Sequence, residues 1–170
     1  MAKRTDKDAR RKADESRSKV IATNRQARRN YEILESVEAG IVLRGSEVKA
    51  LRESKVQLTD SFGRVSGGEI WLVGLHIADY SHAGRFDSHA PVRERKLLLH
   101  RFEIDRLRSR VDQEHLSLVP LSLYFKEGRA KLELGLGRGR SRVDRRQVIA
   151  KRDAELEARR EMSRSLRTPT

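Results

Sequence analysis

The stretch from Tyr31 to Arg52, YEILESVEAGIVLRGSEVKALR, constrains the fold most, because a strand signal, a chain reversal and a helix start follow one another in it without a spacer. Its apolar residues predict a strand over residues 31–37 and a short buried strand over residues 41–43. The small residues at 39–40 would form the bend between them, and Gly-Ser at 45–46 would then end the second strand and cap a helix. The predicted order is strand, strand, helix.

Two glycine-bearing turns predict two further hairpins. Residues 66–68, Ser-Gly-Gly, and residues 127–128, Glu-Gly, each separate two runs of residues that favour strands. Pro120 lies in the run before the second turn, which indicates an edge position or a bulge there. Trp71 lies within an apolar strand run, so we expect it in the core rather than on an RNA-binding surface.

Residues 92–110 are predicted to be helical in two pieces, the first over residues 93–99. His100 and Glu103 have the spacing of a reciprocal helix cap, so the second piece would begin at Arg101. Its buried side would carry Phe102, Ile104 and Leu107.

The predicted fold class is mainly β with inserted helices. About six short strands and two tight hairpins within residues 31–137 favour a small barrel of the oligonucleotide-binding type, since closure removes the exposed edges of so small a sheet. A two-layer α+β sandwich is the alternative.

The positive charge lies at the two ends of the chain. Residues 1–30 hold 11 Lys/Arg against 4 Asp/Glu, residues 138–170 hold 11 against 5, and residues 31–137 hold 16 of each. A neutral middle with two Arg-rich ends favours a nucleic-acid partner over solubilising tails, because the guanidinium group offers phosphate a bidentate donor. We therefore divide the chain into a basic disordered arm (1–24), a barrel (25–137) and a basic C-terminal tail (138–170).

The tail begins with GLGRGRSRVDRR, which combines glycines with basic side chains and predicts a flexible segment from residue 135 that tracks phosphates. Residues 147–166 are rich in helix formers, with a thin apolar stripe and supporting Glu–Arg pairs. Such a helix is marginal in water. We expect the tail to be disordered in the free protein and helical when bound.

Five blocks carry a family resemblance. They are NRQARRNYEI, EAGIVLRGSEVKALR, RERKLLLHRFEIDRL, LVPLSLYFKEGRAKLELGLGRGRSRVDRR and the basic C-terminal tail. In this order and spacing, over about residues 24–160, they resemble the small protein B family, the tmRNA-binding proteins of bacterial trans-translation.

The resemblance implies a barrel that clasps the tRNA-like domain of tmRNA. It implies a tail that becomes helical in the empty mRNA path of a stalled ribosome, at the decoding centre of the small subunit, so that the nascent chain is tagged for proteolysis. Elongation factor Tu and alanyl-tRNA synthetase would act on the same RNA complex.

The resemblance also assigns residues. Those implied to bind RNA are Asn24, Arg25, Arg28, Glu38, Leu99, His100 and Lys131. Those implied to bind the ribosome are Arg138, Arg140, Arg142, Val143, Asp144, Arg145 and Arg146. Without it, Glu38 would be an exposed residue at a strand end, Leu99 a core residue and His100 a helix cap. Val143 departs from the family, which often has a His there to stack on a ribosomal RNA base.

Other chemistry has little support in the sequence. The chain has no cysteine, its five histidines are scattered, and the glycine-rich stretch lacks the ending of a phosphate-binding loop. We expect no enzyme activity, no metal or other cofactor, no membrane contact and a cytoplasmic location. A general single-strand RNA chaperone on the same barrel is the competing function, and an RNA-processing nuclease is a remoter one.

Overall fold

The structure, a computed structural model, describes residues 18–79 and 90–165. Its strands are β1 (Ser18–Thr23), β2 (Tyr31–Ile41), β3 (Val56–Gln57), β4 (Phe62–Ser66), β5 (Glu69–Val73), β6 (His76–Ile77), β7 (Arg95–Leu98), β8 (Ser117–Lys126) and β9 (Arg129–Gly139). Its helices are α2 (Arg25–Asn30), α3 (Gly45–Arg52), α4 (Arg101–Glu114) and α5 (Arg142–Ser165).

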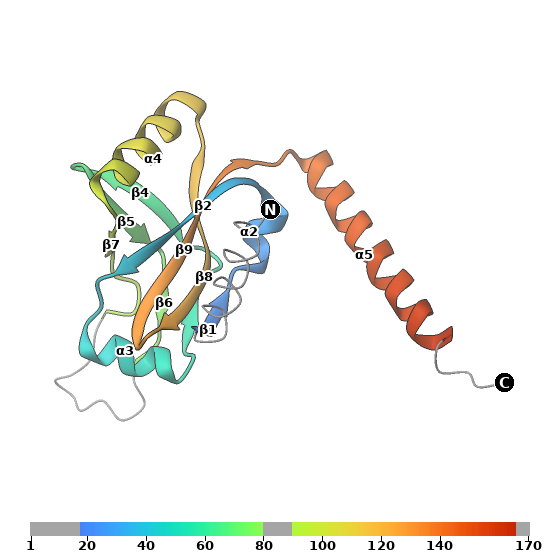
Figure 1. Cartoon of the computed structure of the whole chain (residues 1–170), viewed down its shortest axis with the longest axis horizontal. Helices are drawn as coiled ribbons and strands as arrows, with labels where there is room; N and C mark the ends of the chain where they lie inside the picture. Colours follow the sequence, from blue (N-terminus) through green and yellow to red (C-terminus); the bar gives the residue numbers. More distant parts are fainter. Residues whose placement is uncertain (1–17, 80–89, 166–170) are drawn as a thin grey trace, which may run out of the picture.

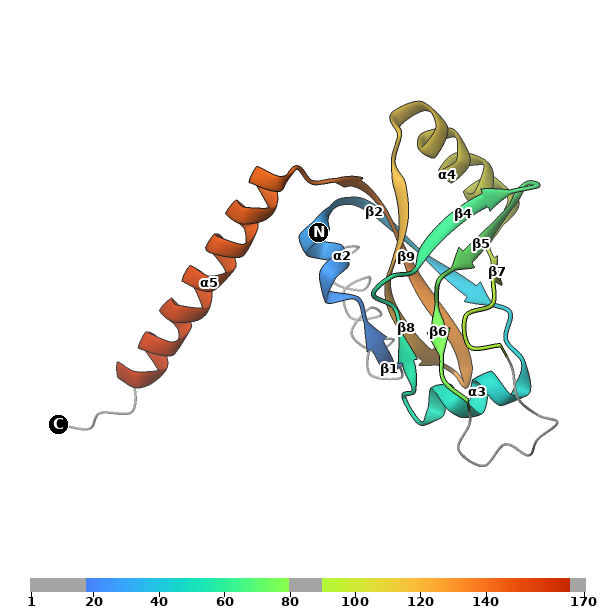
Figure 2. The ribbon, with the colours of Figure 1, turned by 180° about the vertical axis from the view of Figure 1, so that it is seen from behind.

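The main sheet closes into a barrel. Within the described residues the strand order is β1-β8-β4-β5-β7-β2-β9. β9 also pairs with β8, so the strands from β8 to β9 form a closed ring. All neighbouring strands in the ring are antiparallel. β1 lies outside the ring on the far part of β8, while β4 meets β8 only at its start. Figures 1 and 2 show this curved wall from opposite sides. The predicted barrel is confirmed, and the flat two-layer alternative is wrong.

Two helices cover opposite ends of the barrel (Figure 1). α3 contributes Ala50 and Leu51 to the main apolar core, and α4 contributes Ile104 and Leu107. The reciprocal cap of α4 is present, because the backbone N–H of His100 donates to Glu103 at 2.9 Å. Phe102 was expected inside but is 66% exposed, because it lies on the outer side of the first turn.

Both predicted hairpins are confirmed. Gly67 and Gly68 have φ of +60° and +71°, and Glu127 and Gly128 have φ of +50° and +77°. Positive φ at both central residues gives the turn that matches the twist of paired strands. Pro120 lies at a register shift between β8 and β9, so the predicted bulge is present.

The bend predicted at residues 39–40 is wrong. β2 runs unbroken from Tyr31 to Ile41, because β9 pairs with it throughout and keeps Ala39 and Gly40 in the ladder. The small residue at Gly40 serves close packing instead, since a Cβ there would lie 3.2 Å from the Cβ of Leu98.

Three further expectations are corrected. Residues 95–98 are strand β7 rather than helix, because Arg95 and Leu97 face inward between β5 and β2. The basic arm is not disordered through residue 24: residues 18–23 form β1 along β8, and residues 1–17 lie outside the described part. The glycine-rich start of the tail is ordered too, since β9 continues to Gly139 and α5 begins at residue 142 rather than 147.

A buried ion pair joins α3 to β7 and to the loops beside it. Glu47 and Arg95 are both fully buried, and Arg95 Nη2 lies 2.8 Å from Glu47 Oε1. The Arg95 guanidinium also donates to the carbonyls of Leu75 at 2.7 Å and Pro91 at 3.2 Å. All of its donor groups therefore have acceptors, which is the condition under which a buried charge is tolerated.

Glu47 is held by further donors. Arg93 Nε donates to its Oε1 at 2.9 Å and the backbone N–H of Arg44 donates to its Oε2 at 2.7 Å. Burial alone would raise the pKa of Glu47, but the hydrogen bonds from Arg93 and Arg44 and the charge of Arg95 outweigh it and hold this pKa below the usual range. A depressed pKa means that this carboxylate stabilises the fold above the usual glutamate range and that its contribution is lost as pH falls.

We predict that Glu47→Gln lowers the free energy of unfolding by about 3–5 kcal/mol, because it leaves the buried Arg95 charge unbalanced. Glu94→Gln removes an exposed partner of Arg64 and serves as the control, with a change below about 1 kcal/mol. Urea unfolding measures both. The difference between wild type and Glu47→Gln should also shrink as pH falls below the glutamate range. Equal effects of the two substitutions would contradict the account.

Candidate nucleic-acid interface

Glu38 lies in a cluster of polar side chains on the outer face of the barrel. Tyr124 Oη donates to Glu38 Oε2 at 2.7 Å, and Lys126 Nζ lies 3.4 Å from the same oxygen. Lys131 Nζ lies 3.7 Å from Glu38 Oε1. We call these four residues the Glu38 cluster. It combines one carboxylate, two cations and a phenol on three adjacent strands, β2, β9 and β8.

The strand register explains the cluster. Glu38 pairs with Glu133 in β9, Lys131 pairs with Tyr124 in β8, and alternate residues of each strand face outward. The Glu38 side chain is 38% exposed and those of Lys126 and Lys131 are 26% and 31% exposed. The charged atoms are therefore held in place by one another yet open to a partner.

Apolar and aromatic side chains lie beside this cluster, at the end of β7. Leu98 pairs with Gly40, two residues from Glu38, and is 52% exposed. The ring of His100 stacks on Phe102, with centroids 5.7 Å apart and planes 11° from parallel. Both rings are exposed. An exposed aromatic face next to paired charges is a surface on which a base can stack.

A second basic region begins where β2 starts. Arg25, Arg28 and Arg29 are exposed on α2, which precedes Tyr31. At about 3.3 Å per residue, the length of β2 separates this helix from Glu38 by roughly 20 Å. The structure thus divides the predicted residues between two regions of the barrel, and the tail adds a third.

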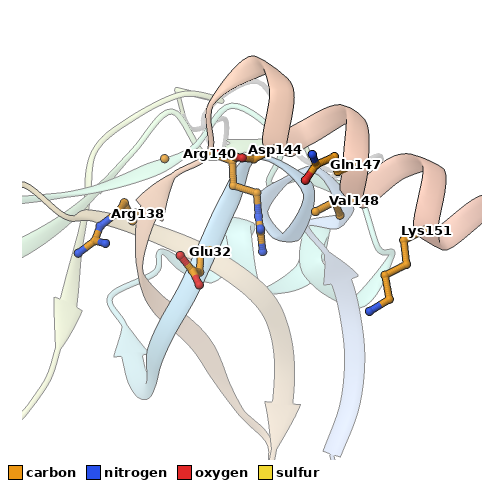
Figure 3. A pocket seen from close by; sticks show the side chains of 8 residues that line it. Glu32, Arg138, Arg140, Asp144, Gln147, Val148 and Lys151 are labelled. Carbon is orange, nitrogen blue, oxygen red and sulfur yellow. The ribbon is translucent and has the colours of Figure 1, made fainter.

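The third region is the junction of β9 and α5. A pocket of about 470 Å³ lies there, lined by Glu32, Arg138, Gly139, Arg140, Asp144, Gln147, Val148 and Lys151. Figure 3 shows the Arg140 side chain between Glu32 and Lys151. Among the described side chains, that of Arg140 has a buried Nε without a hydrogen-bond partner. Both cations and carboxylates line the pocket, so it is a mixed polar junction.

Asp144 and Ser141 form a closed set of hydrogen bonds at the start of α5. The backbone N–H of Asp144 donates to Ser141 Oγ at 3.2 Å, and the backbone N–H of Ser141 donates to Asp144 Oδ2 at 3.2 Å. The Ser141 hydroxyl donates to the same carboxylate at 2.7 Å. The hydrogen bonds from the Ser141 hydroxyl and backbone lower the pKa of Asp144.

Comparison with known proteins identifies the family. The family model described as "SmpB protein" matches residues 21–164, which covers barrel and tail together. The chain belongs to the SmpB family.

Close relatives agree with this assignment. The SsrA-binding protein of Mycolicibacterium smegmatis is 54% identical over 153 residues, which cover 90% of this chain and 94% of the relative. The SsrA-binding protein of Mycobacteroides abscessus is 56% identical over 146 residues, which cover 86% and 91%. A solved chain, from the work described as "tmRNA-SmpB: a journey to the center of the bacterial ribosome", has a TM-score of 0.61 and 48% identity, covering 75% of this chain and 93% of its own.

Two of the residues that the SmpB resemblance implies for RNA binding are largely or partly buried. Asn24 is buried and caps α2: its Oδ1 accepts from the N–H of Ala27 at 3.0 Å, and its Nδ2 donates to the carbonyl of Leu58 at 3.2 Å. In this structure Asn24 positions α2, and its assignment to RNA binding stays a prediction. Leu99 is half-buried against the main core, and its neighbour Leu98 is the exposed leucine.

The residues of the tail that are implied to bind the ribosome differ in their exposure. Arg138 and Arg146 are exposed, and Arg140 is half-buried. The side chains of Arg142, Val143 and Arg145 lie outside the described part, so their assignment stays a prediction. In the described residues, no group of three potential metal ligands gathers in one place, and no helix is long and apolar enough to cross a membrane.

The sequence interpretation missed Tyr124, Lys126 and Phe102. Alternation along β8 places residues 124 and 126 on one side, but only the register of β8 on β9 and β2 brings them to Glu38. That register depends on the bulges in both pairs, which propensities do not reveal.

Gly137 of β9 is packed closely against the backbone of β2, whereas Gly139 is not. A Cβ at Gly137 would lie 2.9 Å from the carbonyl oxygen of Glu32, which is backbone and cannot swing aside, whereas a Cβ at Gly139 would meet nothing within 4 Å. We predict that Gly137→Ala lowers the free energy of unfolding by about 1–3 kcal/mol. Gly139→Ala should stay within about 0.5 kcal/mol, as measured by thermal or urea unfolding. If neither substitution changes the free energy of unfolding, residues 137–139 are flexible, as the sequence alone suggests.

Proposed function

We propose that this protein binds the tRNA-like domain of tmRNA and delivers it to stalled ribosomes for trans-translation. The observation that carries the proposal is the continuous match to SsrA-binding proteins over barrel and tail. The barrel holds the RNA. The tail enters the empty mRNA path at the decoding centre, so that the nascent chain is tagged for proteolysis and the ribosome is released.

The Glu38 cluster is the proposed centre of tmRNA recognition. Its carboxylate accepts hydrogen bonds from the amino groups of bases. Lysine and arginine side chains, which bind phosphates, have no acceptor for these amino groups. Lys126 and Lys131 balance the charge of Glu38 and remain within reach of the backbone phosphates. Tyr124 fixes the carboxylate in one orientation through its 2.7 Å hydrogen bond, which lowers the ordering cost of binding.

The end of β7 extends this surface. His100 and Leu99 contact the same RNA, with His100 supplying the accessible side chain and Leu99 fixing the position of the segment against the core. The arginines of α2, Arg25 and Arg28, bind phosphates at the other end of β2.

The C-terminal tail binds the ribosome. Its basic residues, from Arg138 to Arg146, contact small-subunit RNA, and Val143 packs where the family often stacks a His. The structure has residues 142–165 as helix α5. The exposed apolar side chains of α5 are sparse and few other elements support it, so this helix is marginal in the free protein, where it exchanges with disordered conformations. In the mRNA path the helix is stabilised.

The remaining roles follow from this one. The protein acts in the cytoplasm as a binding protein without catalytic activity. Elongation factor Tu and alanyl-tRNA synthetase associate with it through the RNA that all three share.

The sign of one mutational effect tests the proposal. Glu38→Gln removes a negative charge, which must strengthen binding to any RNA if the protein is a general basic chaperone. If Glu38 accepts from bases, the same change must weaken binding to the tRNA-like domain, by about 5- to 100-fold for a cost of about 1–3 kcal/mol. Filter binding at physiological salt measures the difference.

Matched variants sharpen the result. Glu53→Gln makes the same charge change just after α3, beside Lys55, and should leave the affinity unchanged. Tyr124→Phe keeps the ring, removes the hydrogen bond to Glu38 and should weaken binding by only a few-fold. Tighter binding by Glu38→Gln would sink the proposed recognition role and favour the general chaperone.

A further inference from the structure

The junction between barrel and tail is built from specific local bonds. Ser141 precedes α5 and Asp144 is the third residue of the helix, so the two occupy the N-cap and N3 positions. Their reciprocal bonds satisfy backbone N–H groups that otherwise have no partner at a helix start. This arrangement is a capping box, with Asp in place of the more usual Glu.

The residue before the box is tied to the barrel. The backbone N–H of Arg140 donates to the carbonyl of Asn30 at 2.8 Å, at the end of α2. β9 pairs with β2 up to the match of Gly139 with Tyr31, so the chain is fixed by strand pairing until two residues before the cap. The first residue of α5 is therefore defined relative to the barrel.

We propose that Asp144 is a positioning residue, which with Ser141 fixes where the tail helix starts and thereby sets the register of the tail's basic side chains relative to the barrel. The inference rests on the proposed function and deepens it. A helix advances 1.5 Å and turns 100° per residue, so a start displaced by one residue redirects every later side chain. The exposed Arg146 and Lys151 then depend on the box for their direction.

The box also explains how a tail helix that is marginal in the free protein can begin at a defined residue. Nucleation is the costly step of helix formation, and a cap at the N-terminus favours one start over its neighbours. Figure 3 shows Asp144 at this start, above the pocket between β9 and α5. Its carboxylate is turned to Ser141 by the hydrogen bonds from the Ser141 hydroxyl and backbone N–H, and direct ribosome contact is not needed for its effect.

The positioning role of Asp144 can be tested in a reconstituted tagging reaction that contains the full-length protein, tmRNA and stalled ribosomes. Ser141→Ala should lower the tagging rate about five-fold, the typical effect of losing an N-cap. Asp144→Ala should lower it similarly, and the double substitution should lower it by little more than either one. Asp144→Glu should recover most of the rate lost in Asp144→Ala, because Glu suits this position of the box.

Asp153→Ala is the matched control, since it removes one exposed acidic group from the same helix outside the box and should tag like wild type. Hydrogen exchange of the Asp144 amide in the ribosome complex gives a second readout, with faster exchange expected in Ser141→Ala. A Ser141→Ala protein that tags and exchanges like wild type would overturn the inference, as would an Asp144→Glu protein as impaired as Asp144→Ala.

Failure of the proposed function can be distinguished from failure of this inference. A wild-type protein that supports no tagging contradicts ribosome rescue, while the amide exchange still reports whether the box sets the helix start in the full-length chain. All variants should bind the tRNA-like domain with wild-type affinity, because the box lies outside the Glu38 cluster.

Discussion

The buried pair of Glu47 and Arg95 is the interaction on which the rest of the barrel depends. It joins β7 to α3, which is 48 residues away in the sequence, and to the carbonyls of Leu75 and Pro91. Once β7 is fixed, it can pair with β2 on one side and β5 on the other, and the ring closes. Closure explains how a middle of the chain with few aromatic residues forms a stable wall, since each strand of the ring has a neighbour on both sides.

The closed wall in turn creates the outer surface. β2, β9 and β8 lie side by side, so a residue of β2 meets residues of the β8–β9 hairpin, a distant part of the sequence, in the Glu38 cluster. A carboxylate there would repel a polyanion if it stood alone, and the lysines and the phenol around it change that balance. The same strand β9 continues past this surface to the junction with α5. One continuous strand thus connects the proposed RNA-binding face with the proposed ribosome-binding tail.

The sequence predicted local structure well and long-range structure less well. The turns at residues 66–68 and 127–128 and the cap of α4 were correct, because glycine conformations and capping are decided within a few residues. Strand β7 was taken for a helix because a buried arginine hides the alternation of its inward side chains. Gly137 was assigned to a flexible segment, although it is packed against the backbone of β2. The Glu38 assignment came from the family resemblance, and its lysine and tyrosine partners required the register.

The central claim is that the barrel selects the RNA and the tail serves the ribosome. The most direct measurement compares the full-length protein with a chain ending at Ser141, which keeps β9 and the bond from Arg140 to Asn30 intact. Each is tested for binding to the tRNA-like domain of tmRNA and to an unrelated structured RNA at physiological salt. The account predicts that both prefer the tRNA-like domain and that only the full-length protein supports tagging. A preference that disappears with the tail would contradict it and return the protein to the class of general basic RNA binders.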